Sequence, residues 1–500
     1  MGGFRLLDLV KFFLPILPEV ELPIEKIAFD ERIVYTVGSA VIFLFGQLPI
    51  FGLKSNAQFY INDPFYSVRS IVGMEKGTLL ELGLLPVVTG AFIWQLAAGL
   101  RLINVNLGLR YDRELFQTGQ KLTAFILAIC YTIELISSGY YDNAIRGYDP
   151  LNDSTPFGTY ALIFTQVAGW SWFTTLLVEI FDKGYGFGSG ALCFLALQNA
   201  TNFIADVLGL EVIPIINSNK TESLGALVNL IRNFKLFSPK QTATTIWHAF
   251  TRVQLPNLTQ FYIAVLSIAV FIGLQNFRIE IPIRSTKVRG MNNVFPIKLL
   301  YTGGLPVLFA FTVLMNIQMF AYSFTSLLSK LGAPEFLIPI LAKYETSPTS
   351  NNLVLTSGIF SYFTSSTSLV QSLLAPIRTV VYSASIIFLA VWFANKWSYV
   401  SGSAPKDISK QFKDQGISIS GKRDVSVTKE LARVIPVASV SGAFLLAATC
   451  CLGEFLGGLG KGVAATIGVS SAFGVLEEFM IEYQQSGGSQ FTNALSGLQQ

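Results

Sequence analysis

Residues 304–329 read GLPVLFAFTVLMNIQMFAYSFTSLLS and contain no charged side chain. A helix crosses the hydrocarbon core of a bilayer with about 20 predominantly apolar residues, so this stretch is long enough to span a membrane. Lipid offers no hydrogen-bonding partner to the backbone, which makes a helix the expected conformation. Together with similar stretches elsewhere in the chain, it gives ten predicted spans, at 33–53, 77–103, 119–139, 157–181, 188–213, 256–277, 304–329, 374–395, 434–453 and 458–482. The sequence therefore predicts an all-α polytopic membrane protein with ten transmembrane helices.

The composition of the whole chain agrees with this prediction. The 35 Lys plus Arg and 31 Asp plus Glu residues make up 13% of the 500 residues, against roughly 25% in soluble proteins. Hydrophobic residues reach 51% and the mean hydropathy is +0.53. A compact soluble fold of this composition would leave a large apolar surface in water.

Few residue types suited to catalysis or metal binding are present. His248 is the only histidine, so a site with two histidine ligands is excluded. Cys130, Cys193, Cys450 and Cys451 lie inside apolar runs, where a thiol behaves as a small hydrophobic group. We therefore expect no catalytic residue, no cofactor site and no metal site.

The first 32 residues carry an amphipathic pattern. Arg5, Asp8 and Lys11 recur at three-residue steps among leucines and phenylalanines, which is typical of a short helix lying in the lipid headgroup layer. Residues 1–31 contain no small-residue cleavage site after their apolar run, so the first span is expected to act as its own targeting signal.

The distribution of basic residues predicts the orientation. If the N-terminus is cytosolic, most of the 35 Lys and Arg residues fall on the cytosolic side, as the positive-inside rule requires. Both termini, including the tail 483–500, are then cytosolic. The sequons at Asn152 and Asn219 fall on the opposite face, and the sequence does not decide whether either is glycosylated.

The ten spans divide into two halves of five. The first half covers 33–213, the second covers 256–482, and the polar segment 214–255 connects them. Each half also contains a segment too short or too polar to cross a membrane, at 59–74 and at 353–373. Inverted five-helix halves with such segments are typical of transporters and channels, where irregular backbone lies beside a water-filled cavity.

Two loops on the cytosolic side, 278–303 and 396–433, are rich in basic residues. Flexible basic projections can neutralise phosphates, which favours RNA or anionic lipid as a partner. The alternative is that these charges only fix the topology. Gly290 and Gly421 permit tight turns beside the basic pairs. The basic residues include Arg278, Arg284, Lys287, Arg289 and Lys298 in the first loop and Lys406, Lys410, Lys413, Lys422, Arg423 and Lys429 in the second.

The predicted spans hold few charged residues in their interiors, which argues against a proton-coupled pump and favours a passive pathway. Asn316 lies in the middle of the span 304–329. A buried amide is costly in hydrocarbon unless it pairs with another helix. Asn316 therefore either joins two helices or lies at a helix interface that opens. A secondary transporter of inverted-repeat type remains the alternative. An intramembrane enzyme would need a nucleophile and a base, or a pair of facing Asp residues, and the single histidine argues against the histidine-based versions.

Several motifs, in order along the chain, resemble the SecY and eukaryotic Sec translocon α-subunit family. They are GTLLELGLLP at 77–86, DRELFQ at 112–117, KGYGFGSG at 183–190, IPIRSTKVRG at 281–290, FPIKLLYTGG at 295–304 and KQFKDQG at 410–416. Within that family the second α subunit of budding yeasts is the most similar branch. The segments that favour this branch are FLPILPEVELP at 13–23, NNVFPIKLLYTGG at 292–304 and IEYQQSGG at 481–488.

The resemblance implies a protein-conducting channel in the endoplasmic reticulum membrane with no catalytic activity. Nascent polypeptides would cross it, or leave sideways into lipid through a lateral gate between spans two and three and spans seven and eight. Asn316 would line this gate. Residues 59–74 would form a plug, with Asp63, Pro64, Tyr66 and Ile71 as plug residues. The constriction ring would consist of Leu84, Val88, Ala191, Leu195, Leu308 and Ile467, although a bulkier residue than Ala191 is expected at its position.

The resemblance also implies partners. Lys287, Arg289, Lys422 and Arg423 match the loops with which the family contacts the ribosome. The family works with two small single-span subunits, β and γ. Signal sequences, transmembrane segments of nascent chains and membrane lipid complete the expected partners, and no cofactor is implied.

Overall fold

The computed structural model describes most of the chain. The described residues are 6–54, 63–100, 102–103, 105, 109–147, 156–214, 221–234, 239–252, 255–285, 292–332, 334, 336–346, 353–400, 404–415, 417–419 and 424–485.

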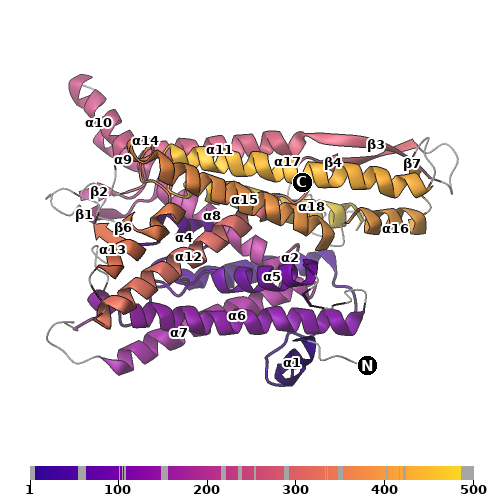
Figure 1. The fold of residues 1–500 in the computed structure, drawn as a ribbon, viewed down its shortest axis with the longest axis horizontal. Coiled ribbons are helices and arrows are strands. Elements are labelled where there is room, and N and C mark those ends of the chain that lie inside the picture. Colours follow the sequence, from indigo (N-terminus) through magenta and orange to yellow (C-terminus); the bar gives the residue numbers. More distant parts are fainter. Residues whose placement is uncertain are drawn as a thin grey trace, which may run out of the picture.

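Long apolar helices run side by side along the longest axis of the molecule (Figure 1). Eight of the described helices are long and apolar enough to cross a membrane. They are α6 (Arg110–Ser138), α7 (Phe157–Asp182), α8 (Gly190–Leu208), α11 (Leu258–Asn276), α12 (Leu305–Lys330), α15 (Pro376–Val400), α17 (Asp424–Phe455) and α18 (Lys461–Gln485). Helices α6 and α7 lie on one side of the bundle in Figure 1, and α11 and α17 lie on the other.

The first two predicted spans correspond to shorter helices. Helix α2 (Phe29–Leu44) has 16 residues and continues into the 3-10 turn η1 (Phe45–Gln47). Helix α5 (Leu85–Gly99) has 15. Their lengths fall below the range of about 17–25 residues for a spanning helix. The structure therefore supports eight spans by length and leaves the predicted count of ten unconfirmed.

The prediction of one continuous span over 77–103 is wrong at its start. Gly77 and Gly83 have φ values of +73° and +51°, in the left-handed region that interrupts a right-handed helix. The segment instead pairs with the chain after α2, since Leu80 N–H donates to the Gly46 carbonyl at 3.0 Å. Helix α5 begins only at Leu85, with a proline in its first turn, a position that proline favours.

The predicted flexible basic loops are ordered for much of their length. Strands β3 (Arg278–Ser285), β4 (Asn292–Lys298) and β7 (Ile417–Ile419) form an antiparallel sheet in the order β4-β3-β7. Ile281 and Ile297 pack with Ile408 and Phe412 of helix α16 (Pro405–Gln415) in a separate hydrophobic cluster. This small core holds the sheet as a projection at one end of the bundle (Figure 1). The predicted ribosome contacts Lys287, Arg289, Lys422 and Arg423, and the turn residues Gly290 and Gly421, lie outside the described residues.

The opposite end of the bundle also carries structure that the sequence did not predict. The connecting segment 214–255 forms strand β2 (Thr221–Ser223), which pairs with β1 (Val212–Pro214), and helices α9 (Ala226–Asn233) and α10 (Pro239–Thr251). The end also holds η3 (Asp142–Ala144), α13 (Leu337–Leu341), β5 (Lys343–Thr346), β6 (Leu353–Ser357), η4 (Ile359–Phe363) and α14 (Leu369–Leu374). Because three small sheets are present, the all-α prediction is corrected to mostly helical. Asn152 and Asn219 lie outside the described residues.

The N-terminal helix α1 (Leu6–Phe13) packs on the bundle through one face. Leu7 and Val10 are buried against Leu115 and Phe116 of α6. Part of its apolar face is thus covered by protein, whereas Phe12 is 74% exposed. Its predicted place in the headgroup layer stays a prediction.

Candidate functional site

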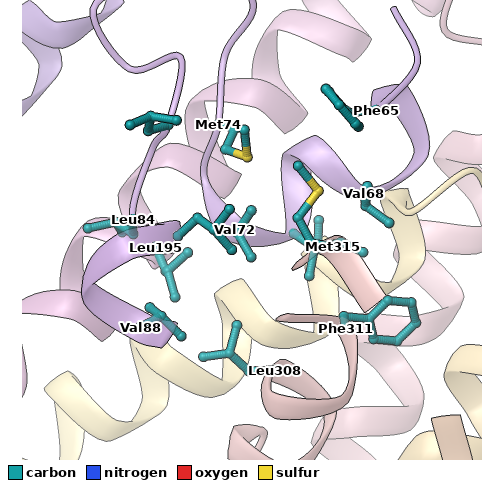
Figure 2. Packing of buried hydrophobic residues seen from close by; sticks show 14 of the residues in the cluster. Phe65, Val68, Val72, Met74, Leu84, Val88, Leu195, Leu308, Phe311 and Met315 are labelled. Carbon is teal, nitrogen blue, oxygen red and sulfur yellow. The ribbon is translucent and has the colours of Figure 1, made fainter. Parts of the chain in front are cut away.

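Most of the predicted constriction positions converge in the middle of the bundle. Leu84 precedes α5, Val88 lies in its first turn, and Leu308 lies in the first turn of α12. Leu195 of α8 and Ile467 of α18 belong to the same buried cluster. Figure 2 shows four of these side chains grouped together. Residues from helices far apart in the sequence therefore belong to one buried apolar cluster.

Ala191, the sixth predicted position, is half-buried and packs against this cluster rather than within it. It lies one helical turn before Leu195 on α8. Its short side chain therefore adds less apolar surface to the cluster than the leucines do.

The predicted plug lies directly against the central cluster. Its described part contains helix α4 (Tyr66–Arg69) and the 3-10 turn η2 (Ser70–Val72), so it is shorter than one continuous helix over 59–74; residues 59–62 lie outside the described residues. The Leu84 N–H donates to the Val72 carbonyl at 3.1 Å. Val72 is fully buried and lies close to Leu195 in Figure 2. The plug therefore fills the middle of the bundle with its own apolar side chains.

The four predicted plug residues differ in their surroundings. Asp63 and Ile71 are buried, and Pro64 and Tyr66 are half-buried. Ile71 belongs to the central hydrophobic cluster. Asp63, Pro64 and Tyr66 instead line a cavity of about 60 Å³ between the plug, α12 and the β5–β6 hairpin.

Buried charges hold the plug to its surroundings. Arg69 Nε donates to Asp63 Oδ2 at 2.6 Å, and Arg69 Nη1 lies 2.8 Å from Glu81 Oε1. The same guanidinium donates to the Tyr140 hydroxyl at 2.7 Å, and that hydroxyl donates to Glu81 Oε1 at 3.2 Å. The side chains of Arg69, Asp63 and Glu81 are at most 6% exposed. We call these four residues the plug network; it links the plug to the turn before α5 and to the end of α6.

The electrostatics of the plug network favour its ionised form. Burial alone would raise the pKa of the Asp63 carboxyl, but the charges of Arg69 and Lys76 hold that pKa below its usual value. Burial lowers the pKa of Lys76 to about 8, with Asp63 opposing the shift. A buried pair of this kind is strongly destabilised when one partner is removed, because an uncompensated charge remains.

A second contact anchors the plug to α18. Gly460 has a φ of +78°, and a Cβ at this position would lie 1.9 Å from the Ser67 carbonyl oxygen. Only glycine permits the backbone of this turn to approach the plug so closely. The next residue, Lys461, donates to Ser70 Oγ at 3.3 Å and pairs with Asp206 of α8 at 2.6 Å.

Asn316 bridges three helices at the predicted gate. Its Nδ2 donates to Thr89 Oγ1 of α5 at 3.2 Å and to the Thr312 carbonyl of its own helix at 2.8 Å. Its Oδ1 accepts from the hydroxyl of Tyr131 on α6. The sequence left open whether Asn316 joins helices or lies at an interface that opens. The geometry agrees with both alternatives. Asn316 joins α12 to α5 and α6, and these are the helices from which α12 would have to part if the predicted gate opened.

A cluster of three aromatic rings, which was not predicted from the sequence, packs between α5 and the helices α12 and α15. The rings of Phe309 on α12 and Phe393 on α15 stack with centroids 4.6 Å apart. Phe92 of α5 meets them edge-on, at 5.3 Å from Phe309 and 5.2 Å from Phe393. The chain contains 41 phenylalanines. Nothing in the sequence distinguishes these three from phenylalanines that take part in ordinary helix packing.

The plug network was likewise missed, although one signal was available. Arg69 and Glu81 are charged residues in segments expected at membrane depth, where an ionisable side chain is costly and commonly functional. The partner Tyr140 lies 71 residues from Arg69, so only the fold could identify it. Among the described residues, no group of three or more His, Cys, Asp or Glu side chains could hold a metal ion.

Comparison with known families agrees with this geometry. The family described as SecY matches residues 78–476, and the family described as the plug domain of Sec61p matches residues 41–77.

The chain belongs to the SecY family.

It is thus a Sec61/SecY-type α subunit of a protein-conducting channel, and the resemblance noted in the sequence is confirmed. The matched plug domain contains the predicted plug 59–74.

Individual SecY-family relatives cover nearly the whole chain. The chain is 42% identical over 500 residues to the Sec sixty-one protein homolog of Saccharomyces cerevisiae, covering 100% of this chain and 99% of the relative. It is 35% identical over 480 residues to the Sec61 subunit alpha of Yarrowia lipolytica, and the match covers 95% of this chain and 98% of the relative. Neither relative is named as an enzyme, and the transporter alternative finds no support.

Solved SecY-family structures share the fold. A yeast Ssh1 complex, described as idle and bound to the yeast 80S ribosome, aligns with a TM-score of 0.75 at 41% identity, covering 98% of this chain and 97% of that one. Sec61 from a canine ribosome-channel complex of the endoplasmic reticulum aligns with a TM-score of 0.71 at 25% identity, and the alignment covers 97% of this chain and 98% of the Sec61 chain. The chain is therefore a mostly helical polytopic membrane protein of the SecY fold.

Proposed function

We propose that this chain docks on ribosomes at the endoplasmic reticulum membrane and conducts nascent polypeptides across the membrane or sideways into it. The observation that supports the proposal is a buried apolar cluster that contains five of the predicted constriction positions, with the predicted plug hydrogen-bonded to Leu84. A closed resting state of this kind suits a passive channel, because an apolar constriction excludes water and ions until a solute displaces it. No catalytic step and no cofactor is part of the proposal.

The proposed topology has ten spans with both termini cytosolic. Helices α2 and α5 serve as the first two spans in addition to the eight longer helices. The positive-inside rule supports this orientation. The proposed regions are a cytosolic segment 1–32, a first half 33–213, a lumenal connection 214–255, a second half 256–482 and a cytosolic tail 483–500.

The proposed gating has two parts. Displacement of the plug breaks the plug network and opens the path through Leu84, Val88, Ala191, Leu195, Leu308 and Ile467. Parting of α12 and α15 from α5 and α6 opens a lateral exit to lipid. The hydrogen bonds of Asn316 and the contacts of Phe92 lie across that boundary, so both would have to break.

The proposed partners follow from the basic projection and from the relatives. The sheet β4-β3-β7 lies at one end of the bundle. In the sequence, Lys287 and Arg289 stand between β3 and β4, and Lys422 and Arg423 stand between β7 and α17. Lys and Arg on such a projection can neutralise ribosomal RNA phosphates. The yeast relative named Ssh1 is described as bound to the 80S ribosome. Small β and γ subunits, signal sequences, nascent transmembrane segments and lipid are the further partners.

Ribosome co-sedimentation across a salt series tests the proposal. The detergent-solubilised complex should bind ribosomes at low salt, and changing Lys287, Arg289, Lys422 and Arg423 to Glu should abolish binding. Reversal of Arg110 and Arg113, which are exposed on α6 and outside the β4-β3-β7 sheet, is the matched control. Absence of binding at low salt, from protein shown to be folded, would contradict ribosome docking.

A further inference from the structure

Helix α10 exposes an apolar stripe at the end of the bundle opposite the β4-β3-β7 sheet. Ala243, Ile246, Trp247 and Phe250 recur at the spacing i, i+3, i+4, i+7, which places them on one helix face. Ile246 is 41% exposed, Trp247 70% and Phe250 37%. The Trp247 side chain, which is mostly exposed, contributes little to the packing of the bundle, so this part of the stripe is available to an external partner.

The neighbouring face of α10 is polar. Lys240, Gln241, Thr244 and His248 are all exposed, and the helix contains no acidic residue. An apolar stripe beside a polar face without acidic groups is typical of helices that lie in the plane of a membrane interface.

The inner face of α10 fixes its position. Arg252, directly after the helix, donates to the carbonyls of Ser223 and Leu224 at 2.8 and 2.7 Å, and its side chain is 4% exposed. Ala249 is buried against Leu258. Helix α10 is therefore held at a defined angle, and Figure 1 shows it projecting obliquely outward from the end of the bundle.

The stripe continues the surface that α11 presents to lipid. The rings of Phe250 and Tyr262 stack with centroids 5.9 Å apart and 8° between their planes. Tyr262, Val265 and Leu266 of α11 are 55%, 42% and 61% exposed, on a helix apolar enough to span the membrane. In a bilayer the exposed side of a spanning α11 would face hydrocarbon, and the stripe on α10 would begin where that surface reaches the headgroups.

We propose that α10 is an interfacial anchor that lies in the headgroup layer of the leaflet at this end of the bundle, with Ile246, Trp247 and Phe250 toward the acyl chains. Tryptophan favours this layer, because its ring is apolar and its N–H reaches water. The inference rests on the SecY-type membrane fold and not on polypeptide conduction. It adds a fixed lipid contact next to α11, the first helix of the second half.

Fluorescence quenching in lipid nanodiscs tests the anchor. A single NBD-labelled cysteine is placed at Ile246 or Trp247, in the full-length chain with its partner subunits and with Cys130 and Cys193 changed to Ala. Thr244→Cys, on the polar face of the same helix, is the matched control. Labels at Ile246 and Trp247 should be quenched by headgroup-proximal doxyl lipids about threefold more than the label at Thr244, and less by aqueous iodide.

Two results would overturn the anchor. Strong iodide quenching with little doxyl quenching at Ile246 and Trp247 would place the stripe in water. Protection from both quenchers would mean that a protein partner covers it. Equal elution volumes and thermal midpoints of the labelled variants establish that the complexes are folded. Ribosome binding is measured separately, so failure of the proposed function and failure of the anchor give different results.

Discussion

Removal of the Arg69 guanidinium should release the plug. Arg69→Gln leaves the Asp63 and Glu81 carboxylates buried at 3% and 0% side-chain exposure, with Lys76 as the nearby cation. Glutamine cannot replace the bidentate contact with Asp63, whose oxygens lie 2.6 and 3.1 Å from the guanidinium nitrogens. When the plug moves out, Asp63 is free to regain water.

The size of the effect follows from the burial of the pair. Breaking a buried ion pair by removing one partner costs about 3–5 kcal/mol. A difference of about 1.4 kcal/mol changes an equilibrium tenfold, so the ratio of seated to displaced plug should fall by about two to four orders of magnitude. Even if a third of this cost acts on plug seating, the displaced population should rise about tenfold.

Ion conductance of the reconstituted complex in planar bilayers measures the displaced population directly. The expected result for Arg69→Gln is a leak about tenfold or more above that of the unchanged protein. Arg110→Gln is the matched control, since Arg110 pairs with Glu114 at 2.9 Å while its side chain is 82% exposed. Exposed pairs contribute about 0–1 kcal/mol, so this variant should leak little more than the unchanged protein.

A second variant separates the network from simple misfolding. Asp63→Asn combined with Arg69→Gln removes one of the two uncompensated carboxylates, so the leak should fall back toward that of the unchanged protein. The reasoning is refuted if Arg69→Gln leaks no more than Arg110→Gln at equal thermal stability. It is also refuted if the double variant leaks as much as the single one.

Three further predictions concern the ring, the gate and Lys76. Changing Leu84, Val88 and Leu308 together to Gly should raise the ion leak of reconstituted channels, and an unchanged conductance would remove them from the ring. Asn316→Leu should allow signal sequences of lower hydrophobicity to insert. The reason is that hydrogen bonds between membrane helices contribute about 0.6–1.7 kcal/mol, and the hydroxyl partners of Asn316 on α5 and α6 lose their hydrogen bonds. If the hydrophobicity threshold for insertion is unaltered while the stability is lower, Asn316 is a purely structural link. Burial lowers the pKa of Lys76 to about 8 from 10.5. The Lys76 amine is therefore neutral at a lower pH when the plug is seated than when it is displaced. Seating of the plug should strengthen by about 1.4 kcal/mol per pH unit as the pH rises from about 8 toward 10.5. The leak should fall over that range, and a Lys76→Met channel with the same fall would contradict the assignment.

Features with a local physical signal could be predicted from the sequence. The stretch 304–329 becomes α12 (Leu305–Lys330), because an uncharged apolar run of this length has one stable conformation in lipid. Asn316 was recognised for the same reason, since a polar amide in such a run needs a partner. The ring positions, by contrast, came from motif resemblance, because a leucine in a ring and a leucine in ordinary packing look alike in the sequence.

Features that depend on contacts distant in sequence could not be predicted. The turns at 77–84 form because left-handed glycines let the segment pair with the chain after α2, although its apolar residues read as part of a span. The basic loop of 278–303 reads as flexible, yet its alternate isoleucines pack on α16, more than a hundred residues later. The plug network requires Tyr140, whose position relative to Arg69 only the fold determines.

Site-specific photo-crosslinking tests the central claim, conduction of nascent chains through the ring, most directly. A photoreactive residue replaces either Leu308, a buried residue at a predicted ring position, or Leu266, which is 61% exposed on α11. Ribosomes stalled on a secretory nascent chain are then bound to the reconstituted complex. The account predicts a crosslink from position 308 to the nascent chain that depends on a functional signal sequence, and none from position 266. Crosslinking of neither position, or of position 266 alone, in complexes that bind the ribosome would contradict it.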